Sequence, residues 1–276
     1  MRQPVSATPM PARCSREARA LSGRGGIRRL VAGALMATTL ASGQALPKKS
    51  GLDYATPAVA AMQRDDTLNP ALLWLQAGQQ AWDSRDGVAR SCASCHGDVQ
   101  QLRGVATRYP AFDEGLQRPV TLAQRIDQCR TRHQQASAWP AESEPRLAVE
   151  LLVANASRGL PIRAVDDPRL AAALAQGRQI YHQRLGQLDL SCAQCHTEHA
   201  EQRLAGSAIT QGQATGYPIY RLEWQGLGSL QRRLRACFNG VRAEPFAADA
   251  PQSVALELYL RQRAAGLPIE TPGVRP

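Results

Sequence analysis

Apolar residues recur every three or four positions in several separate segments of the chain. This spacing is clear in residues 148–162, 170–181 and 254–269, and in the segments that carry Cys129 and Cys237. Such a period places the apolar side chains on one face of a helix. Alternation typical of strands is scarce, and stretches rich in Gly, Thr and Gln, such as residues 206–218, are predicted to be loops. The pattern therefore predicts an all-α, mainly helical protein.

The apolar run nearest the N-terminus is too short to form a membrane-spanning helix. Residues 1–29 contain seven arginines and one acidic residue, and residues 30–41 (LVAGALMATTLA) are apolar or small. This order is typical of a secretory signal peptide, with cleavage expected near Gly43 or Ala45. A membrane anchor is the alternative, but about 12 apolar residues are too few to cross about 30 Å of hydrocarbon. We therefore predict an exported protein whose signal peptide occupies residues 1–45 and which keeps no membrane anchor.

Removal of the signal peptide changes the charge of the protein. The full chain carries a formal net charge of +10 and has an isoelectric point near 9.8. The signal peptide accounts for +6 of this charge, so the mature chain is left with +4. Because no basic cluster interleaved with aromatic residues is visible in the rest, we expect no binding to nucleic acid. The remaining length of about 230 residues allows one large domain or two small ones.

Six cysteines remain after the loss of Cys14, and four of them form two motifs of one kind. The motifs are SCASCH, with Cys92, Cys95 and His96, and SCAQCH, with Cys192, Cys195 and His196. In a C-x-x-C-H motif the two thiols form thioethers to a c-type haem, and the adjacent histidine is the proximal iron ligand. A zinc site or a redox-active thiol pair is the alternative for a single motif. Thiol pairs tend to become disulfides in an oxidising compartment, so two such motifs in an exported chain predict two covalently bound haem c groups.

The similarity between the two parts of the chain extends beyond these motifs. Three features recur: a Tyr-Pro pair at residues 109–110 and 217–218, the spacing Leu-x-x-Arg-x-x-x-Cys at 122–129 and 230–237, and a Gly-Leu-Pro-Ile segment at 159–162 and 266–269. A unit that returns after roughly 100 to 108 residues indicates an internal duplication. Gly159 and Gly266, each followed closely by proline, are predicted to stop the helices before them. We predict two tandem cytochrome c-like domains, residues 46–163 and 164–276, joined around residues 163–168.

Cys129 and Cys237 have no cysteine neighbour and occupy equivalent places in the two repeats. A haem with a proximal histidine has a sixth coordination position that methionine often fills, but Met62, the only methionine left, precedes both motifs. Each lone cysteine shares the apolar face of its predicted helix with two aliphatic residues, so both thiols are expected to point toward a haem. Arg125 and Arg233, one turn earlier, are expected to lower the thiol pKa and favour the thiolate. We therefore expect each thiol to be the metal ligand opposite the motif histidine.

Other arrangements of these thiols and irons stay open. A disulfide between Cys129 and Cys237 would be ordinary in an exported protein, but equivalent positions of tandem domains normally lie a domain's width apart. The alternative iron ligands are His133, His182 and His199. His133 lies one turn after Cys129, yet its equivalent in the second repeat is Val241. Only the cysteines recur at equivalent positions in both repeats.

Over about residues 70–270, the two motifs, the two later cysteines and the stretch CFNGVRAE at residues 237–244 together resemble the SoxA family. Its dihaem members are catalytic subunits of the periplasmic SoxAX thiosulfate-oxidising cytochrome. The resemblance implies histidine and cysteine ligation of both irons, with the cysteine matching Cys237 found as a persulfide at the active, second haem. It also implies L-cysteine S-thiosulfotransferase activity, in which thiosulfate is joined oxidatively to a cysteine of the carrier protein SoxYZ. The implied electron acceptor is a SoxX-like c-type cytochrome bound in a heterodimer.

The residues around Cys237 suit an anionic sulfur substrate. Thiosulfate is a dianion, and Arg233 and Arg242 flank the cysteine, so both are candidate catalytic residues of a substrate pocket. Solvated surface charge is the other explanation for these arginines. A persulfide can exchange with an incoming sulfane sulfur by nucleophilic displacement, while haem removes electrons that no side chain could hold. An anionic sulfur ligand also favours Fe(III), so low haem potentials are expected.

Other functions compete with this one. A thiosulfate dehydrogenase joins two thiosulfates to tetrathionate and needs no carrier, but a matching cysteine in both domains favours SoxA. A dihaem electron-transfer cytochrome without a substrate would be better suited by methionine or histidine ligation than by two thiolates. A dihaem peroxidase would need an open or displaceable histidine site, which the symmetry of the repeats disfavours.

Overall fold

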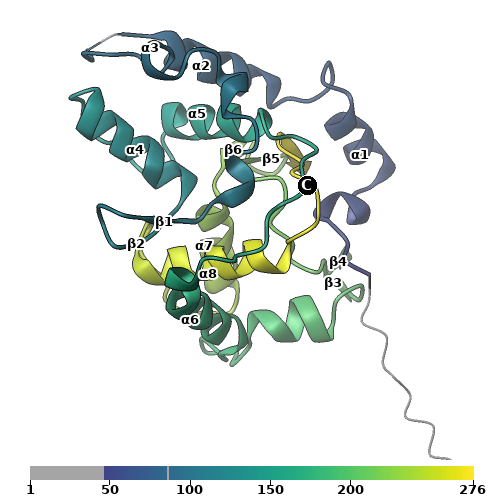
Figure 1. Cartoon of the computed structure of the whole chain (residues 1–276). Helices are drawn as coiled ribbons and strands as arrows, with labels where there is room; N and C mark the ends of the chain where they lie inside the picture. Colours follow the sequence, from purple (N-terminus) through teal and green to yellow (C-terminus); the bar gives the residue numbers. More distant parts are fainter. Residues whose placement is uncertain (1–46, 86) are drawn as a thin grey trace, which may run out of the picture. The chain divides into compact units, whose positions relative to one another are not determined.

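The computed structural model describes residues 47–85 and 87–276, and Figure 1 shows how their helices and strands are arranged. The predicted signal peptide, residues 1–45, lies outside the described residues. Within the described part of the chain, no helix is both long enough and apolar enough to cross a membrane.

Helices make up most of the regular structure, as the apolar spacing predicts. The α-helices are α1 (Pro57–Arg64), α2 (Leu72–Asp83), α3 (Ala93–His96), α4 (Leu122–His133), α5 (Glu144–Asn155), α6 (Ala171–His182), α7 (Leu230–Gly240) and α8 (Pro251–Arg263). The shorter helical turns are η1 (Gly51–Tyr54), η2 (Val99–Leu102), η3 (Ala106–Arg108), η4 (Pro168–Leu170) and the π-helical η5 (Gln194–Glu198). The helices predicted around the lone cysteines and before the second motif are confirmed, whereas α1 and α2 lie outside the predicted helices.

The strands are short and form small sheets. They are β1 (Ala111–Asp113), β2 (Arg118–Val120), β3 (Arg203–Leu204), β4 (Ser207–Ala208), β5 (Ile219–Arg221), β6 (Gly226–Gly228) and β7 (Gly273–Arg275). β1 pairs with β2 and β3 with β4, both antiparallel, while β5 pairs antiparallel with β6 and parallel with β7. Strands of two or three residues are too short to show alternation in a sequence. The sequence therefore predicts only a loop at residues 206–218, where the structure has the two-residue strand β4.

The helices α5 and α8 end earlier than the glycines predicted to stop them. α5 ends at Asn155 and α8 at Arg263, and one further turn follows before Gly159 and Gly266. Both glycines have positive φ angles, 81° and 89°, in the left-handed region that glycine adopts without strain. The glycines therefore redirect the chain after the helices have ended.

Two helix pairs, α2 with α5 and α6 with α8, pack closely at a glycine. A side-chain carbon on Gly78 would overlap the backbone carbonyl of Ala148, and one on Gly177 would overlap that of Ala255. Only glycine allows two helix backbones to approach so closely. Because Ala148 and Ala255 are equivalent in the repeat, the same crossing is built twice, as an internal duplication predicts.

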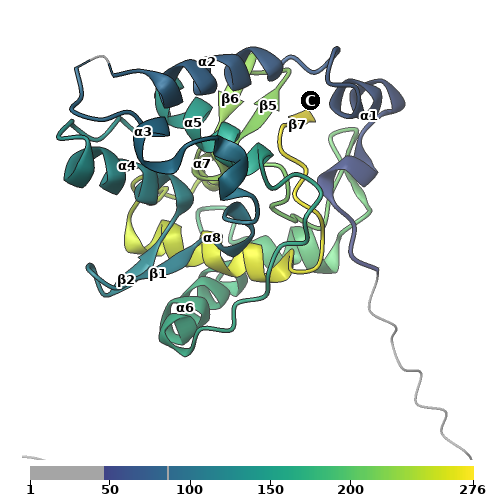
Figure 2. The ribbon, with the colours of Figure 1, turned by 45° about the horizontal axis from the view of Figure 1, so that its top comes forward.

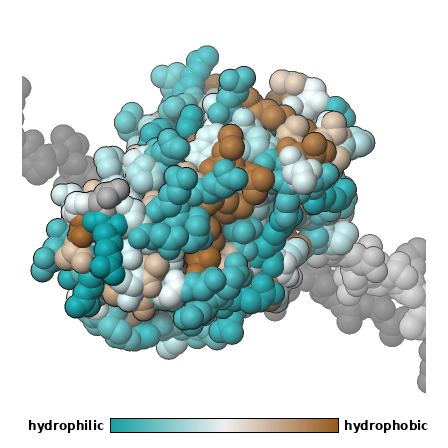
Figure 3. All heavy atoms as spheres, turned by 90° about the horizontal axis from the view of Figure 1, so that it is seen from above, coloured by the Kyte–Doolittle hydropathy of each residue, from teal (hydrophilic) through white to brown (hydrophobic). Residues whose placement is uncertain are grey.

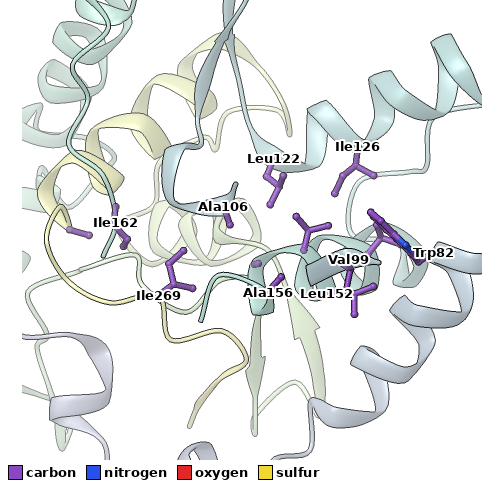
Figure 4. Close-up of a cluster of buried hydrophobic side chains, with 13 residues drawn as sticks. Trp82, Val99, Ala106, Leu122, Ile126, Leu152, Ala156, Ile162 and Ile269 are labelled. Carbon is purple, nitrogen blue, oxygen red and sulfur yellow. The ribbon is translucent and has the colours of Figure 1, made fainter. Parts of the chain in front are cut away.

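The described residues form one compact unit in which the two repeats share a core. Figure 4 shows the larger buried cluster, where Trp82, Leu122 and Ile162 of the first repeat are joined by Ile269 of the second. A second cluster includes Ile180, Tyr181, Phe238 and Leu256. The second repeat thus has a core of its own and also helps to close the first. The domain boundary near residue 163 stays a prediction.

The two Gly-Leu-Pro-Ile segments pair with each other where the repeats meet. The Gly159 N–H donates to the Ile269 carbonyl at 2.9 Å, and the Gly266 N–H donates to the Ile162 carbonyl at 2.9 Å. The N–H groups of the two isoleucines donate in the same reciprocal way to leucine carbonyls of the opposite segment. Every bond therefore has a counterpart in which the repeats exchange roles, as in an antiparallel pair around a local twofold axis.

The helix α2 lies near the β5–β6 hairpin, as Figure 2 shows. The rings of Trp74 in α2 and Tyr220 in β5 meet with their centroids 5.6 Å apart. Elsewhere on α2, Leu72 is 37% exposed and Leu73 is 67% exposed. Figure 3 looks onto the side of the molecule where α2 lies and shows apolar residues gathered there. An exposed apolar surface of this kind is typical of a contact with another protein.

Candidate functional site

A serine precedes each C-x-x-C-H motif and shapes the turn after it. The Ser91 hydroxyl accepts a hydrogen bond from the Ser94 N–H at 3.1 Å, and the Ser191 hydroxyl accepts one from the Gln194 N–H at 3.2 Å. Such bonds are typical of a helix N-terminus, and both motifs are wound into helical turns, α3 and η5. A helical turn brings residues three or four positions apart to one side of the chain. The two motifs therefore present their thiols and histidines from short helical segments.

The helices that carry the lone thiols, α4 and α7, begin at hydroxyl caps and bury an apolar face. The Thr121 hydroxyl accepts an N–H of the first turn of α4 at 3.1 Å, and the Ser229 hydroxyl does the same for α7 at 3.0 Å. The buried residues on these faces include Leu122, Ile126 and Leu230. Cys129 and Cys237 follow at helical spacing and are partly buried. Capping and burial together decide which face of each helix turns inward.

In the first repeat, Cys129 lies close to the thiols of the motif. The pKa of the Cys92 thiol is raised, mainly by burial and also by Cys129, although the Gln134 Nε2 donates to its sulfur at 3.4 Å and opposes this. The pKa of Cys129 is also raised, mainly by burial, while Arg125 lowers it and Cys95 raises it. Thiols affect one another's pKa only over short distances. Gln134 follows α4 directly, so its bond to Cys92 holds the end of the helix that carries Cys129 beside the motif.

The second repeat has the same arrangement with Cys237. Burial raises the pKa of the Cys192 thiol to about 11, and the nearby Cys237 is the next largest cause. Burial also raises the pKa of Tyr217, on which Arg233 and Cys237 act in opposite directions. The structure thus brings Cys237, Arg233 and Tyr217 together beside the second motif.

The expectation that Arg125 lowers the pKa of Cys129 is wrong in its net sign. Arg125 does lower that pKa, but burial outweighs it. The guanidinium is already engaged, because its Nη2 lies 2.8 Å from the Asp113 carboxylate and its Nε donates to the Tyr109 hydroxyl at 3.2 Å. A paired guanidinium has less influence on a third group. A thiolate at this position would form together with a bound metal, which requires it.

The structure also bears on the alternatives for the lone thiols. All six described cysteines are free, so Cys129 and Cys237 form no disulfide. His182 packs its ring against Tyr181, with centroids 5.3 Å apart. The exposed histidines outside the motifs are His133, His182 and His199. The two cysteines remain the residues that face the motifs from equivalent helices.

The two motif histidines are held differently. The His196 Nδ1 lies 2.8 Å from the Thr210 carbonyl oxygen, and the Gly212 backbone packs on the same ring. A hydrogen bond from Nδ1–H to a carbonyl leaves Nε2 available for a metal and makes it more basic. Burial also lowers the pKa of His196, which favours the neutral form that binds metal. His96 is exposed, has no such hydrogen bond among the described residues, and meets the Trp82 ring at 5.8 Å.

Eight additional residues in the second repeat account for this difference. Tyr109 lies 13 residues after His96, whereas Tyr217 lies 21 residues after His196. The longer segment forms the β3–β4 hairpin and the loop whose Thr210 carbonyl reaches the histidine. Thr210 was not predicted as a functional residue. The signal that marks it is the change of the repeat length from 100 residues at the motifs to 108 at the Tyr-Pro pairs.

The two predicted arginines occupy different surroundings. Burial lowers the pKa of His196 and raises that of Tyr217, and the charge of Arg233 lowers both to a smaller extent. Arg233 therefore lies beside the second motif. Arg242 is exposed in the turn after α7, with a φ angle of 58°. The ion pairs formed among the described residues involve neither side chain.

At one position that is equivalent in the two repeats, the first site has an acidic residue and the second site a basic one. Asp113 ends β1 and pairs with Arg125, whereas the residue that ends β5 is Arg221. Arg221 pairs with the exposed Glu223 at 3.1 Å, and its charge still acts on Tyr217. At the second site the charges of Arg233, Arg221 and Arg275 act on the tyrosine. At the first site Arg125 is bound to the buried Asp113 carboxylate, on which Arg132 also acts. An anion is better accommodated at the second site.

Comparison with known proteins agrees with this architecture. The family model described as SoxA/TsdA, cytochrome c domain, matches residues 77–162 and 176–269. The L-cysteine S-thiosulfotransferase subunit SoxA of Rhodovulum sulfidophilum is 35% identical over 229 residues, which are 82% of this chain and 80% of the relative. The chain belongs to the SoxA family. The subunit of the same name from Pseudaminobacter salicylatoxidans is 34% identical over 77% of this chain and 76% of its own length.

A solved structure extends the SoxA assignment to three dimensions. The crystal structure of SoxXA from P. pantotrophus matches with a TM-score of 0.80 and 31% identity, over 83% of this chain and 87% of that chain. The mainly helical, duplicated cytochrome c fold predicted from the sequence is therefore confirmed. So is the resemblance to SoxA that the motifs and later cysteines indicated.

The donor groups of this SoxA chain fit haem c. Each site combines two motif thiols, an adjacent histidine and a facing thiol, and at the second site the histidine has its Nδ1 already bonded, which leaves Nε2 for iron. No cluster of His, Cys, Asp and Glu side chains suited to a bare metal ion is found in the part of the chain that the structure describes. The matched cytochrome c domain implies haem c.

Proposed function

We propose that this chain is the catalytic dihaem subunit of a periplasmic L-cysteine S-thiosulfotransferase. It joins thiosulfate to a cysteine of a SoxYZ-like carrier and passes two electrons to a SoxX-like c-type cytochrome with which it forms a heterodimer. The observation that carries the proposal is the meeting of Cys237, Arg233 and Tyr217 beside the second motif. Support comes from the enzyme name of the curated relatives and from the SoxXA complex that the fold matches.

The residues of both sites divide into those that attach haem and those that bind iron. The proposed thioether residues are Cys92, Cys95, Cys192 and Cys195. The proposed iron ligands are His96 and Cys129 at the first haem, and His196 and Cys237 at the second. When bound, haem c takes up electrons one at a time and transfers them to a redox partner. The protein contributes the orientation of the ligands and the charge around them.

The coupling of thiosulfate to a thiol releases two electrons and one proton. One sulfur–sulfur bond forms, between the sulfane sulfur of thiosulfate and the sulfur of the carrier cysteine, and the S–H bond of the carrier breaks. The proton goes to solvent, and the two electrons go to the cytochrome partner. Cys237, as a persulfide, offers a terminal sulfur that can exchange with the sulfane sulfur of the substrate. The carrier leaves with the thiosulfate group attached.

The charge around the second motif favours a dianion. Arg233 and Arg242 have no ion pair among the described residues, so each is available to donate charge-assisted hydrogen bonds to thiosulfate. The equivalent of Arg233 in the first repeat, Arg125, is bound to Asp113 at 2.8 Å. We therefore assign catalysis to the second haem and an electron-carrying or structural role to the first.

An assay with and without the carrier tests this function. Haem-loaded protein is mixed with thiosulfate and oxidised partner cytochrome, and cytochrome reduction is followed while the carrier is analysed by mass spectrometry. We expect reduction only when the carrier thiol is present, together with attachment of thiosulfate to that thiol. Reduction without the carrier, with tetrathionate as product, would show a thiosulfate dehydrogenase. No reduction in either case would show a plain electron-transfer cytochrome.

A further inference from the structure

The segment that follows the predicted signal peptide lies against the loop that holds His196. Residues 47–50, named here the N-terminal arm, are bound by the buried side chain of Gln211. The Gln211 Nε2 donates to the Pro47 carbonyl at 2.9 Å, and its Oε1 accepts the Lys49 N–H at 3.0 Å. One primary amide thus satisfies both a backbone acceptor and a backbone donor. The arm is fastened to a loop more than 160 positions later in the chain.

Gln211 stands between the two backbone groups that contact the His196 ring. Thr210 precedes it and accepts the hydrogen bond of the ring Nδ1 at 2.8 Å. Gly212 follows it with a φ angle of 68°, and a side-chain carbon there would lie 3.0 Å from the ring Cγ. The Gln211 carbonyl also accepts the Arg263 Nη2 at 3.1 Å. Because adjacent peptide units are planar and covalently joined, displacement of Gln211 displaces both groups on the ring.

The first repeat offers a natural comparison. Its segment between the motif and the Tyr-Pro pair is eight residues shorter, and among the described residues the His96 ring has no backbone carbonyl bonded to it. The arm and its clamp therefore serve the second histidine only. The cleavage expected near Gly43 or Ala45 puts the arm at the start of the mature chain, so the mature N-terminus becomes part of the second site.

We propose that Gln211 and the N-terminal arm position the proximal ligand of the second haem, by holding the Thr210 carbonyl on the His196 Nδ1. This inference rests on the proposed role of His196 as an iron ligand. Gln211 is a positioning residue, because it acts through Thr210 and reaches the iron only through the imidazole. A hydrogen bond at Nδ1 makes Nε2 a stronger donor to Fe(III), so it lowers the haem potential. Loosening the clamp raises that potential.

Two substitutions at Lys49 distinguish the contribution of its backbone N–H from that of its side chain. Lys49→Pro removes the N–H that Gln211 accepts. Lys49→Ala keeps that N–H and removes the exposed contacts of the side chain, an ion pair with Glu201 at 2.7 Å and a position over the Tyr54 ring at 5.9 Å. Gln211→Ala removes both bonds from the other side, and Gln211→Glu keeps the acceptor while it loses the donor. If Lys49→Pro fails to fold, Gln211→Ala carries the test, because it only shortens a side chain.

The measurement is the midpoint potential of each haem in the full, haem-loaded chain. For Gln211→Ala and Lys49→Pro we expect the preference of the second haem for Fe(III) to fall about threefold, a rise of about 28 mV for one electron. Gln211→Glu shifts it less, and Lys49→Ala leaves it unchanged. The first haem keeps its potential in all four variants and serves as the internal control. Amide hydrogen exchange in residues 209–213 speeds up in the two strong variants.

Two outcomes overturn the inference. Faster amide exchange with an unchanged potential would mean that the clamp is only structural, and an equal shift at both haems would mean a general loss of stability. Failure of the underlying assignment gives a different result. Absence of haem from the second motif, or an unchanged signal of the second haem in His196→Ala, would overturn the ligand role of His196 itself.

Discussion

At the first site Arg125 is bound to Asp113 at 2.8 Å, whereas at the second site Arg233 has no ion pair among the described residues. The His96 ring is exposed, whereas the His196 ring is bonded to the Thr210 carbonyl. The helix crossings, the motifs and the facing thiols are common to both repeats. The two repeats therefore share the parts proposed to attach haem, and their differences include one exchange of charge and eight additional residues. The features that both sites share are those expected for haem attachment. The features found at one site only are those expected to adapt that site to its own reaction.

Loss of one lone thiol is expected to have the largest effect. Cys237→Met removes the sulfur that is proposed to exchange with the substrate. Thiosulfate-dependent reduction of the partner cytochrome is therefore expected to fall by more than about a thousandfold, while haem content is kept. In the native protein, peptide mass spectrometry finds about 32 Da extra on Cys237, one added sulfur that a thiol reductant removes.

The matched control is Cys129→Met. It is expected to change the spectrum of the first haem and to leave measurable turnover, because the role proposed for that thiol is iron binding alone. A fully active Cys237→Met protein would contradict the assignment of catalysis to the second site.

The next largest effect is a difference in activity between substitutions of the two equivalent arginines, Arg233 and Arg125. Arg233→Ala removes the proposed charge-assisted hydrogen bonds to a dianion. We therefore expect kcat/KM for thiosulfate to fall roughly 10- to 150-fold, which corresponds to about 1.5 to 3 kcal/mol of transition-state binding. Arg125→Ala is expected to leave turnover nearly unchanged. It removes the ion pair of the buried Asp113 carboxylate, which keeps the Leu116 N–H as a donor, so it costs about 1 to 3 kcal/mol of unfolding free energy. Steady-state kinetics and denaturant unfolding of both variants check the pair. Equal losses of activity would remove the distinction between the sites.

Substitution of the glycine at either helix crossing is expected to lower stability by a similar amount. Alanine at Gly78 or at Gly177 meets the carbonyl of Ala148 or Ala255, and the helices must separate. Each substitution is expected to lower the unfolding free energy by about 1 to 3 kcal/mol, without a selective effect on either haem potential. Denaturant unfolding followed by circular dichroism checks this. A strong effect in only one repeat would show that the crossings are not equivalent.

The smallest effect concerns a carboxyl pair between the repeats. Glu150 and Glu257 occupy equivalent positions and line a cavity of about 50 Å³ bordered by both repeats. Burial raises the pKa of Glu150 to about 8 and that of Glu257 to about 7, from 4.5. The folded state therefore holds protons that the unfolded state has lost, and stability falls as the pH rises from 4.5 to 8. The slope is at most about 1.4 kcal/mol per pH unit for each proton.

The substitution Glu150→Gln tests this pair. It keeps the size of the side chain and removes one titrating group, so the curve of unfolding free energy against pH becomes flatter. The groups whose charges act on Glu150 include Glu257, Arg146, Glu142 and Asp249, and Arg261 in the same cavity interacts with it as well. Unfolding at several pH values between 5 and 8 gives the comparison. An unchanged slope in the variant would mean that Glu150 is not the group that titrates.

The sequence predicted those features that depend on residues close together in the chain. A C-x-x-C-H motif can be recognised because its chemistry lies within five consecutive residues. The helices around Cys129 and Cys237 follow from apolar residues three and four positions apart, and the duplication from repeated spacings. The short strands escaped prediction because two or three residues show no period. The role of Gly78 and Gly177 in the helix crossings was not predicted either. A glycine inside a helix lowers helix propensity, and its packing role can be recognised only when the position of the opposing backbone is known.

Only the tertiary structure decided how these parts act on one another. Burial, which no local pattern measures, outweighs Arg125 and raises the pKa of Cys129. The Thr210 carbonyl reaches His196 only because eight additional residues fold back over the motif. Gln211 and Lys49 meet across 162 positions. The energies of desolvation, ion pairing and hydrogen bonding depend on distances that the packing of the whole chain sets. The sequence therefore determined that two C-x-x-C-H motifs recur in a duplicated unit, and the fold decided the surroundings of each motif.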